Sequence, residues 1–183
     1  NRFVEREKIM QNQLLKEANE FQEKLSAWRR ALHQNSEIGL HLPKTVRQFV
    51  KKELEQMDIP YTVYEESSCI VALIGSGEKC FMLRSDMDAL PVREESGEPF
   101  ASENGCMHAC GHDMHTTTLL GAAKLLKSHE RELKGTVKLL FQSAEETFQG
   151  AKAAVDAGVL ENPRVDAAFA MHVAPNSENK KII

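Results

Sequence analysis

The sequence predicts an α/β domain with a central parallel or mixed sheet flanked by helices. Short apolar runs typical of buried strands alternate with longer stretches in which apolar residues recur every three or four positions. The predicted order is helix, strands, helix, strand, helix, strand, and such alternation is typical of layered α/β domains. With 183 residues, the chain is long enough for one domain with a buried core.

Helical spacing dominates the first third of the chain. Residues 4–33 place apolar side chains three or four positions apart among Glu, Lys, Gln and Arg, which predicts one long amphipathic helix. Residues 34–39 break this pattern. Pro43 suits the first turn of a second helix, because the N–H group that proline lacks would be unpaired there. The pair at 59–60 ends that helix.

The rest of the chain alternates strands with helices. Apolar runs predict five strands, at residues 61–64, 69–74, 80–83, 137–141 and 165–172. Two more helices are expected at residues 116–128 and 151–157. The polar stretch 84–113 is long for a connection, and long ordered loops in compact domains are usually functional.

Composition excludes several classes of protein. Lys and Arg number 23 and Asp and Glu 27, so no basic excess is available to neutralise nucleic-acid phosphates. No apolar run reaches the roughly 18 residues of a bilayer span. Four cysteines are too few for a disulfide scaffold at this length. A cytoplasmic protein that binds neither nucleic acid nor membrane is therefore expected.

The densest group of candidate metal ligands lies between residues 106 and 115. Its members are Cys106, His108, Cys110, His112 and His115. Thiolate and imidazole are ligands that zinc and similar ions prefer, and the glycine at 111 permits a tight turn between two of them. The segment predicts a metal site. A structural zinc module and a set of unrelated loop residues are the alternatives.

Three predicted strands are followed by polar groups. Glu145 and Glu146 follow strand 137–141, and one carboxylate could bind metal while the other acts as general base. Asp86 and Asp88 follow strand 80–83, where they could orient a ligand imidazole. His172 ends the last strand. Each group alone has a simpler interpretation. The two glutamates could be surface acids, the two aspartates a polar turn, and His172 an ordinary edge histidine. Their convergence on one sheet edge favours a metal site.

Five motifs resemble a known family. They are LHQNSEIG (32–39), RSDMDALP (84–91), MHACGHDMH (107–115), LFQSAEE (140–146) and MHVAP (171–175). Their order is similar to that in the amidohydrolase branch of the aminoacylase/carboxypeptidase metallopeptidases, which includes hippurate, N-acyl-amino-acid and auxin-conjugate hydrolases. The resemblance implies a layered zinc-exopeptidase-like fold. It also implies metal-dependent hydrolysis of the amide bond of N-acyl amino acids or dipeptide-like substrates.

The resemblance assigns roles to particular residues. It implies that the metal ligands are Cys110, His112, Glu146 and His172, and that Glu145 is the general base. It also implies two divalent ions in a full-length site, with zinc, manganese, cobalt and nickel all compatible with this ligand set. Asp86 and Asp88 are given a supporting role only. Cys106, His108 and His115 are left out, because they are not ligands in the family.

The chain also departs from the family pattern. Ser36 and Ser143 replace residues that are usually proline, and Thr147 stands where glycine is common. Family members run to about twice this length, so residues 1–183 are expected to be the N-terminal part of the catalytic domain. The resemblance implies that the inserted lid and dimerisation domain and the C-terminal part are absent here. This part alone is expected to be weakly active or inactive, and the full-length parent to be a homodimer.

Two other functions remain open on the residues. A non-catalytic zinc-binding module formed by residues 106–115 would hold metal without Glu146 and His172. A cysteine-nucleophile enzyme would use Cys110 with a histidine base and would need no metal. Neither gives a role to the pair at 145–146, so the metal-dependent amidohydrolase is the preferred hypothesis.

Overall fold

The computed structural model describes residues 2–178. Its strands are β1 (Tyr61–Tyr64), β2 (Cys69–Gly75), β3 (Cys80–Asp86), β4 (Thr136–Gln142) and β5 (Ala167–Ala170). They form one sheet in the order β1-β2-β4-β3-β5. β2 pairs antiparallel with β1 and β4, whereas β3 pairs parallel with β4 and β5. The carboxyl ends of the three parallel strands therefore meet at one edge, and β5 is an edge strand whose four residues are all exposed.

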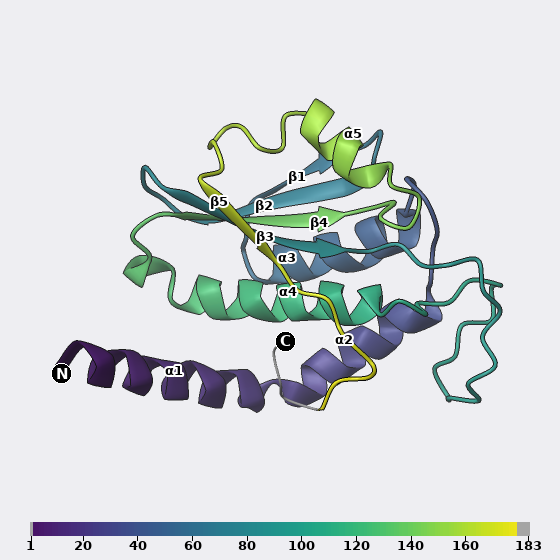
Figure 1. Cartoon of the computed structure of the whole chain (residues 1–183), viewed down its shortest axis with the longest axis horizontal. Helices are drawn as coiled ribbons and strands as arrows, with labels where there is room; N and C mark the ends of the chain where they lie inside the picture. The colour runs from purple at the N-terminus through teal and green to yellow at the C-terminus, as the bar shows by residue number, and fades with distance from the viewer. Residues whose placement is uncertain (1, 179–183) are drawn as a thin grey trace.

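Helices cover both faces of this sheet (Figure 1). They are α1 (Arg2–Glu20), α2 (Gln22–Gln34), the π-helix η1 (Pro43–Val50), α3 (Lys51–Gln56), α4 (His112–Ser128), the short η2 (Glu130–Glu132) and α5 (Gly150–Asp156). In Figure 1, α5 lies on one side of the sheet, and α2, α3 and α4 lie on the other. The predicted fold, a central mixed sheet flanked by helices, is confirmed.

The alternation of β2 explains why two cores form. Ile70 and Ile74 point to one face, where they pack with Trp28 of α2 and Leu120 of α4. Val71 points to the other face and packs with residues of α5 and the segment after it. Successive strand side chains point to opposite faces, so an apolar run such as 69–74 serves both layers. Among the described residues, no helix has the length and apolar character needed to cross a membrane.

A buried lysine holds the connection between α5 and β5. Lys138 of β4 is 1% exposed, and its Nζ donates hydrogen bonds to the carbonyls of Val159, Glu161 and Pro163 at 2.7, 2.9 and 2.8 Å. Burial lowers the pKa of Lys138. Three backbone acceptors compensate for the removal of the ammonium from water.

The structure corrects two predicted elements near the N-terminus. The single helix expected at 4–33 is divided at Phe21, whose backbone leaves the helical region at φ −112° and ψ 23°. The division lets both α1 and α2 contact α4. At the division itself, Nζ of Lys124 in α4 lies 5.6 Å from the centre of the Phe21 ring. The helix expected from Pro43 begins as η1 and becomes α-helical only at Lys51.

Two further corrections concern the candidate site. α4 begins at His112, four residues before the predicted start, so the end of the predicted loop is helical. β5 ends at Ala170, so His172 lies beyond the strand rather than in it. The start of α4 was misplaced because its first-turn side chains are polar and face the site, and hydrophobic periodicity does not register such positions. The end of β5 was misplaced because the apolar run continues to Met171, whereas the pairing with β3 stops at Ala170.

Candidate metal centre

Gly111 forms the sharp turn that starts the site. It precedes α4 with φ +89°, in the left-handed region that favours glycine. A Cβ atom at this position would lie 2.5 Å from Cγ2 of Val173, so a larger residue would also displace the segment after β5. The turn places Cys110 two residues before the helix and His112 at its first position, at the carboxyl edge of the parallel strands.

His112 lies at the centre of the cluster. Its side chain is fully buried at 0% exposure. Nε2 lies 3.8 Å from Asp86 Oδ2, 3.8 Å from Glu145 Oε2 and 3.7 Å from Glu146 Oε1, and Nδ1 lies 3.6 Å from Asp88 Oδ1. These separations are too long for hydrogen bonds. Neither ring nitrogen has a hydrogen-bond partner among residues 2–178.

The surrounding carboxylates give this position a strongly negative environment. Burial opposes the charged form of His112, but Asp88, Asp86 and Glu146 outweigh it and raise its pKa. Four carboxylates around one imidazole repel one another unless a cation lies between them. The electrostatics of the cluster therefore favour a bound cation.

Cys110 and His172 meet at the outer side of His112. Cys110 Sγ lies 3.2 Å from His172 Nε2, and His172 Nδ1 hydrogen-bonds to the Val173 carbonyl at 2.6 Å. Because a carbonyl only accepts, Nδ1 carries the proton and Nε2 presents a lone pair toward the sulfur. Burial, and then the charges of Glu146 and Glu145, raise the pKa of Cys110 to about 11. A raised pKa disfavours the nucleophilic thiolate unless a metal supplies positive charge.

Asp88 shapes the turn that carries the two glutamates. Its Oδ1 accepts the backbone N–H of Glu145 at 2.9 Å, and its Oδ2 accepts that of Glu146 at 3.1 Å. Ala144, just before them, has φ +48°. The Glu145 side chain is 35% exposed and the Glu146 side chain 20%. The more accessible carboxylate is the one predicted to act as the base.

Unpartnered buried atoms show that these residues fit a metal. In the described part of the chain, both His112 nitrogens and Glu146 Oε1 lack hydrogen-bond partners. One ligand atom each from Cys110, His112 and His172 lie within 4.8 Å of one another, and so do those of His112, Glu145 and Glu146. Thiolate, imidazole and carboxylate together form a donor set suited to a divalent transition metal. The structure thus brings all five predicted site residues together.

Asp86 and His115 complete the buried wall of the site. Asp86 accepts hydrogen bonds from His115 Nδ1 at 2.6 Å and from Arg84 Nη1 at 2.8 Å. Burial alone would raise the pKa of Asp86, but His115, the charge of His112 and Arg84 hold it at about 2. His115 was left out of the predicted site. The helix was predicted to begin at residue 116, and the place of His115 in the first turn of α4 becomes visible only because α4 begins at His112.

A second polar network supports the site from behind. Asp113, next to His112, accepts a hydrogen bond from His33 Nδ1 at 2.8 Å and pairs with Arg29 at 2.8 Å. His33 Nε2 contacts Glu94 Oε1 at 3.1 Å, so α2 and the long loop are tied to the start of α4. His33 belongs to the motif at 32–39, but the resemblance assigns it no role. Its neighbours one helical turn earlier are Arg29 and Arg30, so hydrophobic periodicity does not single out this histidine.

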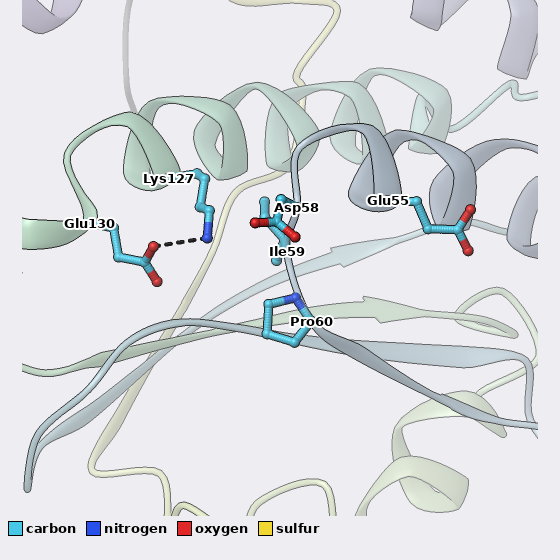
Figure 2. A pocket seen from close by; sticks show the side chains of 6 residues that line it. All are labelled: Glu55, Asp58, Ile59, Pro60, Lys127 and Glu130. Carbon is cyan, nitrogen blue, oxygen red and sulfur yellow. Dashed lines mark hydrogen bonds and ion pairs between the residues drawn. The ribbon is translucent and has the colours of Figure 1, made fainter.

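A shallow hollow of about 590 Å³ lies at the opposite end of α4 (Figure 2). It is lined by Glu55, Asp58, Ile59, Pro60, Lys127 and Glu130. Lys127 Nζ donates to Glu130 Oε2 at 2.9 Å, as the dashed line in Figure 2 marks. None of these six residues belongs to the metal cluster, so the hollow is separate from the candidate centre.

Comparisons with known proteins identify the family of this chain. The model of peptidase family M20/M25/M40 matches residues 82–183. The IAA-amino acid hydrolase ILR1-like 4 of Arabidopsis thaliana is 48% identical over 161 residues, which are 87% of this chain and 36% of that protein. N-acetylcysteine deacetylase of Bacillus subtilis is 39% identical over 163 residues, which are 85% of this chain and 41% of that protein.

A solved structure shows the same fold. The Bacillus subtilis YXEP protein, described as a dinuclear metal-binding peptidase of the M20 family, superposes with a TM-score of 0.81 at 39% identity. The match covers 86% of this chain and 44% of that one. The chain thus spans less than half the length of the relatives that it matches.

Proposed function

The chain belongs to peptidase family M20/M25/M40, and from that premise we propose that it is the N-terminal part of a metal-dependent amidohydrolase catalytic domain. The reaction is hydrolysis of the amide bond of small N-acyl amino acids. Relatives named for N-acetylcysteine deacetylation and for N-acyl-L-amino acid amidohydrolysis support this substrate class. The inserted lid, the C-terminal part, the homodimer and the cytoplasmic location stay predictions for the whole protein.

The observation that carries the proposal is the state of His112. A fully buried imidazole with two unpartnered nitrogens is costly unless a ligand satisfies it. Cys110, Glu146 and His172 place sulfur, oxygen and nitrogen atoms around it. These four residues would hold up to two divalent ions, of which zinc, manganese, cobalt and nickel all suit the donors.

The chain's own residues then divide the work. Bound metal would supply a Lewis acid that polarises the amide carbonyl and acidifies water. Glu145, half-exposed beside the cluster, accepts the proton of the attacking water on its carboxylate and returns it to the leaving amine nitrogen. Asp88 fixes the turn that aims Glu145, and Asp86 and His115 keep the buried side of the site ordered.

The zinc-module alternative makes a different prediction about distant residues. A module formed by residues 106–115 alone would hold metal without the turn after β4 or the segment after β5. The structure places Glu146 Oε1 3.7 Å from His112 and His172 Nε2 3.2 Å from Cys110, which supports a shared centre.

Metal content of variants tests the proposal. We expect elemental analysis to find metal in the 183-residue chain, and less in the variants Glu146→Ala and His172→Ala. Glu145→Gln is the matched control, since it alters the neighbouring carboxylate but should leave metal content unchanged. In a chain extended to the length of its relatives, the same Glu145→Gln change should abolish hydrolysis of N-acetyl amino acids. Unchanged metal in the Glu146 and His172 variants would contradict the shared centre.

A further inference from the structure

We propose that His115 is a positioning residue that holds His172 in place at the metal centre. The inference rests on the proposed function, because it takes His172 to be a metal ligand. His115 lies beside both histidines of the cluster, His112 and His172. The centre of its ring is 5.3 Å from that of His112 and 4.6 Å from that of His172. Its side chain is nearly fully buried.

Both ring nitrogens of His115 are already used. Nε2 accepts the backbone N–H of Val173 at 3.0 Å, and Nδ1 contacts Asp86 Oδ1 at 2.6 Å. A backbone N–H can only donate, so Nε2 carries no proton. Nδ1 therefore carries the proton and donates it to Asp86. His115 is held as one neutral tautomer by a partner on each side.

Because of these two hydrogen bonds, His115 is not one of the proposed metal ligands. Asp86, His112 and His115 lie close enough to form a metal-binding group of their own. The lone pair of His115 Nε2, however, is committed to Val173, and its other nitrogen is protonated. His112 is the reverse case, since neither of its nitrogens has a partner in residues 2–178. His115 therefore orders the site, and His112 binds the ion.

The effect of His115 reaches His172 through the backbone. β5 ends at Ala170, so residues 171–173 lie beyond its sheet pairing. His172 is exposed, and its neighbour Val173 is seated between the His115 nitrogen and the open side of Gly111. Arg84, Asp86, His115 and Val173 thus form a continuous chain of hydrogen bonds from β3 to the candidate ligand. Loss of the bond to Val173 frees the segment that carries His172.

Two substitutions separate the two bonds of His115. In His115→Gln the amide oxygen replaces Nε2 as acceptor for Val173, whereas in His115→Asn the amide NH₂ replaces Nδ1 as donor to Asp86. We expect His115→Asn to raise the Kd for Zn²⁺, measured by competition with a chelator, by about 10- to 100-fold. We expect the Kd of His115→Gln for Zn²⁺ to stay within about threefold of that of the unsubstituted chain. If His115 only filled space, Gln would not restore the affinity that Asn loses. His129→Asn is the matched control, because His129 also uses both nitrogens but lies at the far end of α4.

A measurement without metal keeps the inference distinct from the proposed function. In the metal-free chain, long-range ¹H–¹⁵N correlation should show His115 protonated at Nδ1, and hydrogen exchange should show Val173 N–H protected. Protection should be lost in His115→Asn and kept in His115→Gln, with both variants folded by circular dichroism. An Nε2-protonated His115 or an unprotected Val173 would overturn the inference. If these results hold but the chain binds no Zn²⁺, the role of His115 in ordering residues 171–173 is supported and the proposed function of this chain fails.

Discussion

Asp88 Oδ1 accepts the backbone N–H of Glu145 at 2.9 Å. The second oxygen of the same carboxylate accepts the next N–H, that of Glu146, at 3.1 Å. One buried aspartate after β3 thus fixes the turn after β4 that carries both the proposed base and a proposed ligand. The parallel pairing of β3 and β4 makes this contact possible, because it brings their carboxyl ends together.

Replacing Asp88 should therefore impair the metal site and the fold together. Asp88→Ala removes both acceptors and leaves two N–H groups unpaired, which we expect to lower the free energy of unfolding by about 2–4 kcal/mol. Metal content should fall as well. Urea denaturation and elemental analysis measure the two effects.

Asp166→Ala is the control for Asp88. Asp166 also accepts a backbone N–H, that of Cys80 at 2.8 Å, but at the opposite end of β3. This variant should lose stability without losing metal. If Asp88→Ala binds as much metal as the unsubstituted chain, the turn does not depend on Asp88 and our account of it is wrong.

Gly111→Ala should be more damaging than an ordinary glycine substitution. Alanine in a left-handed backbone conformation costs about 1–2 kcal/mol of stability. At Gly111 the new Cβ would also lie 2.5 Å from Cγ2 of Val173. We expect a larger loss of unfolding free energy and weaker Zn²⁺ binding, since the segment carrying His172 must move.

Gly105→Ala isolates the backbone effect in that comparison. Gly105 has φ +82°, close to that of Gly111, but a Cβ there meets nothing within 4 Å. Its substitution should cost stability while leaving Zn²⁺ affinity unchanged. Equal effects of the two variants on affinity would show that contact between Gly111 and Val173 does not matter.

Lys138→Met should destabilise the chain at a distance from the metal. Methionine keeps the apolar stem but leaves the carbonyls of Val159, Glu161 and Pro163 without their donor. Some of this loss is offset because the buried charge also disappears, so we expect a net cost of about 2–4 kcal/mol in urea denaturation. Lys79→Met, at an 81% exposed side chain, should cost far less. If Lys138→Met leaves the free energy of unfolding unchanged, the Lys138 ammonium does not have this structural role.

The reactivity of Cys110 should distinguish metal binding from nucleophilic catalysis. Burial, and then Glu146 and Glu145, raise its pKa to about 11 from the ordinary 9.0. In the metal-free chain at pH 7 it should hold about a hundredfold less thiolate than an ordinary thiol. Alkylation by iodoacetamide should therefore be slow at pH 7 and accelerate as the pH rises toward 11.

The same shift has a consequence for stability. The folded chain holds the Cys110 proton more tightly than the unfolded chain. The contribution of this thiol to the free energy of unfolding is therefore full below about pH 9 and is lost as the pH rises through the folded pKa of about 11.

Mass spectrometry in a Cys106→Ser background measures the alkylation of Cys110, because the two other cysteines, Cys69 and Cys80, are buried. Rapid alkylation at pH 7 in the presence of chelator would instead favour the cysteine nucleophile.

Much of the fold was predictable because strands and helices leave clear periodic patterns. The sheet strands were placed to within a few residues. The five proposed site residues were predicted from their chemistry and from the family motifs, and the structure brings them close together. The break at Phe21 was not predictable, because the apolar spacing continues across it while the backbone leaves the helical conformation. The role of His115 was not visible either. It depends on the N–H of Val173, 58 residues away, and a backbone contact of that kind leaves no trace in side-chain identity.

The coordination of bound Zn²⁺ tests the central claim most directly, and X-ray absorption at the zinc edge reads it. Our account predicts one sulfur near 2.3 Å, from Cys110, with nitrogen and oxygen ligands at about 2.0–2.2 Å from His112, His172 and Glu146. The sulfur contribution should persist in Cys106→Ser and vanish in Cys110→Ser. Two sulfurs per zinc, or a sulfur contribution lost in Cys106→Ser, would show that the segment 106–115 binds zinc as a module and would contradict the shared centre.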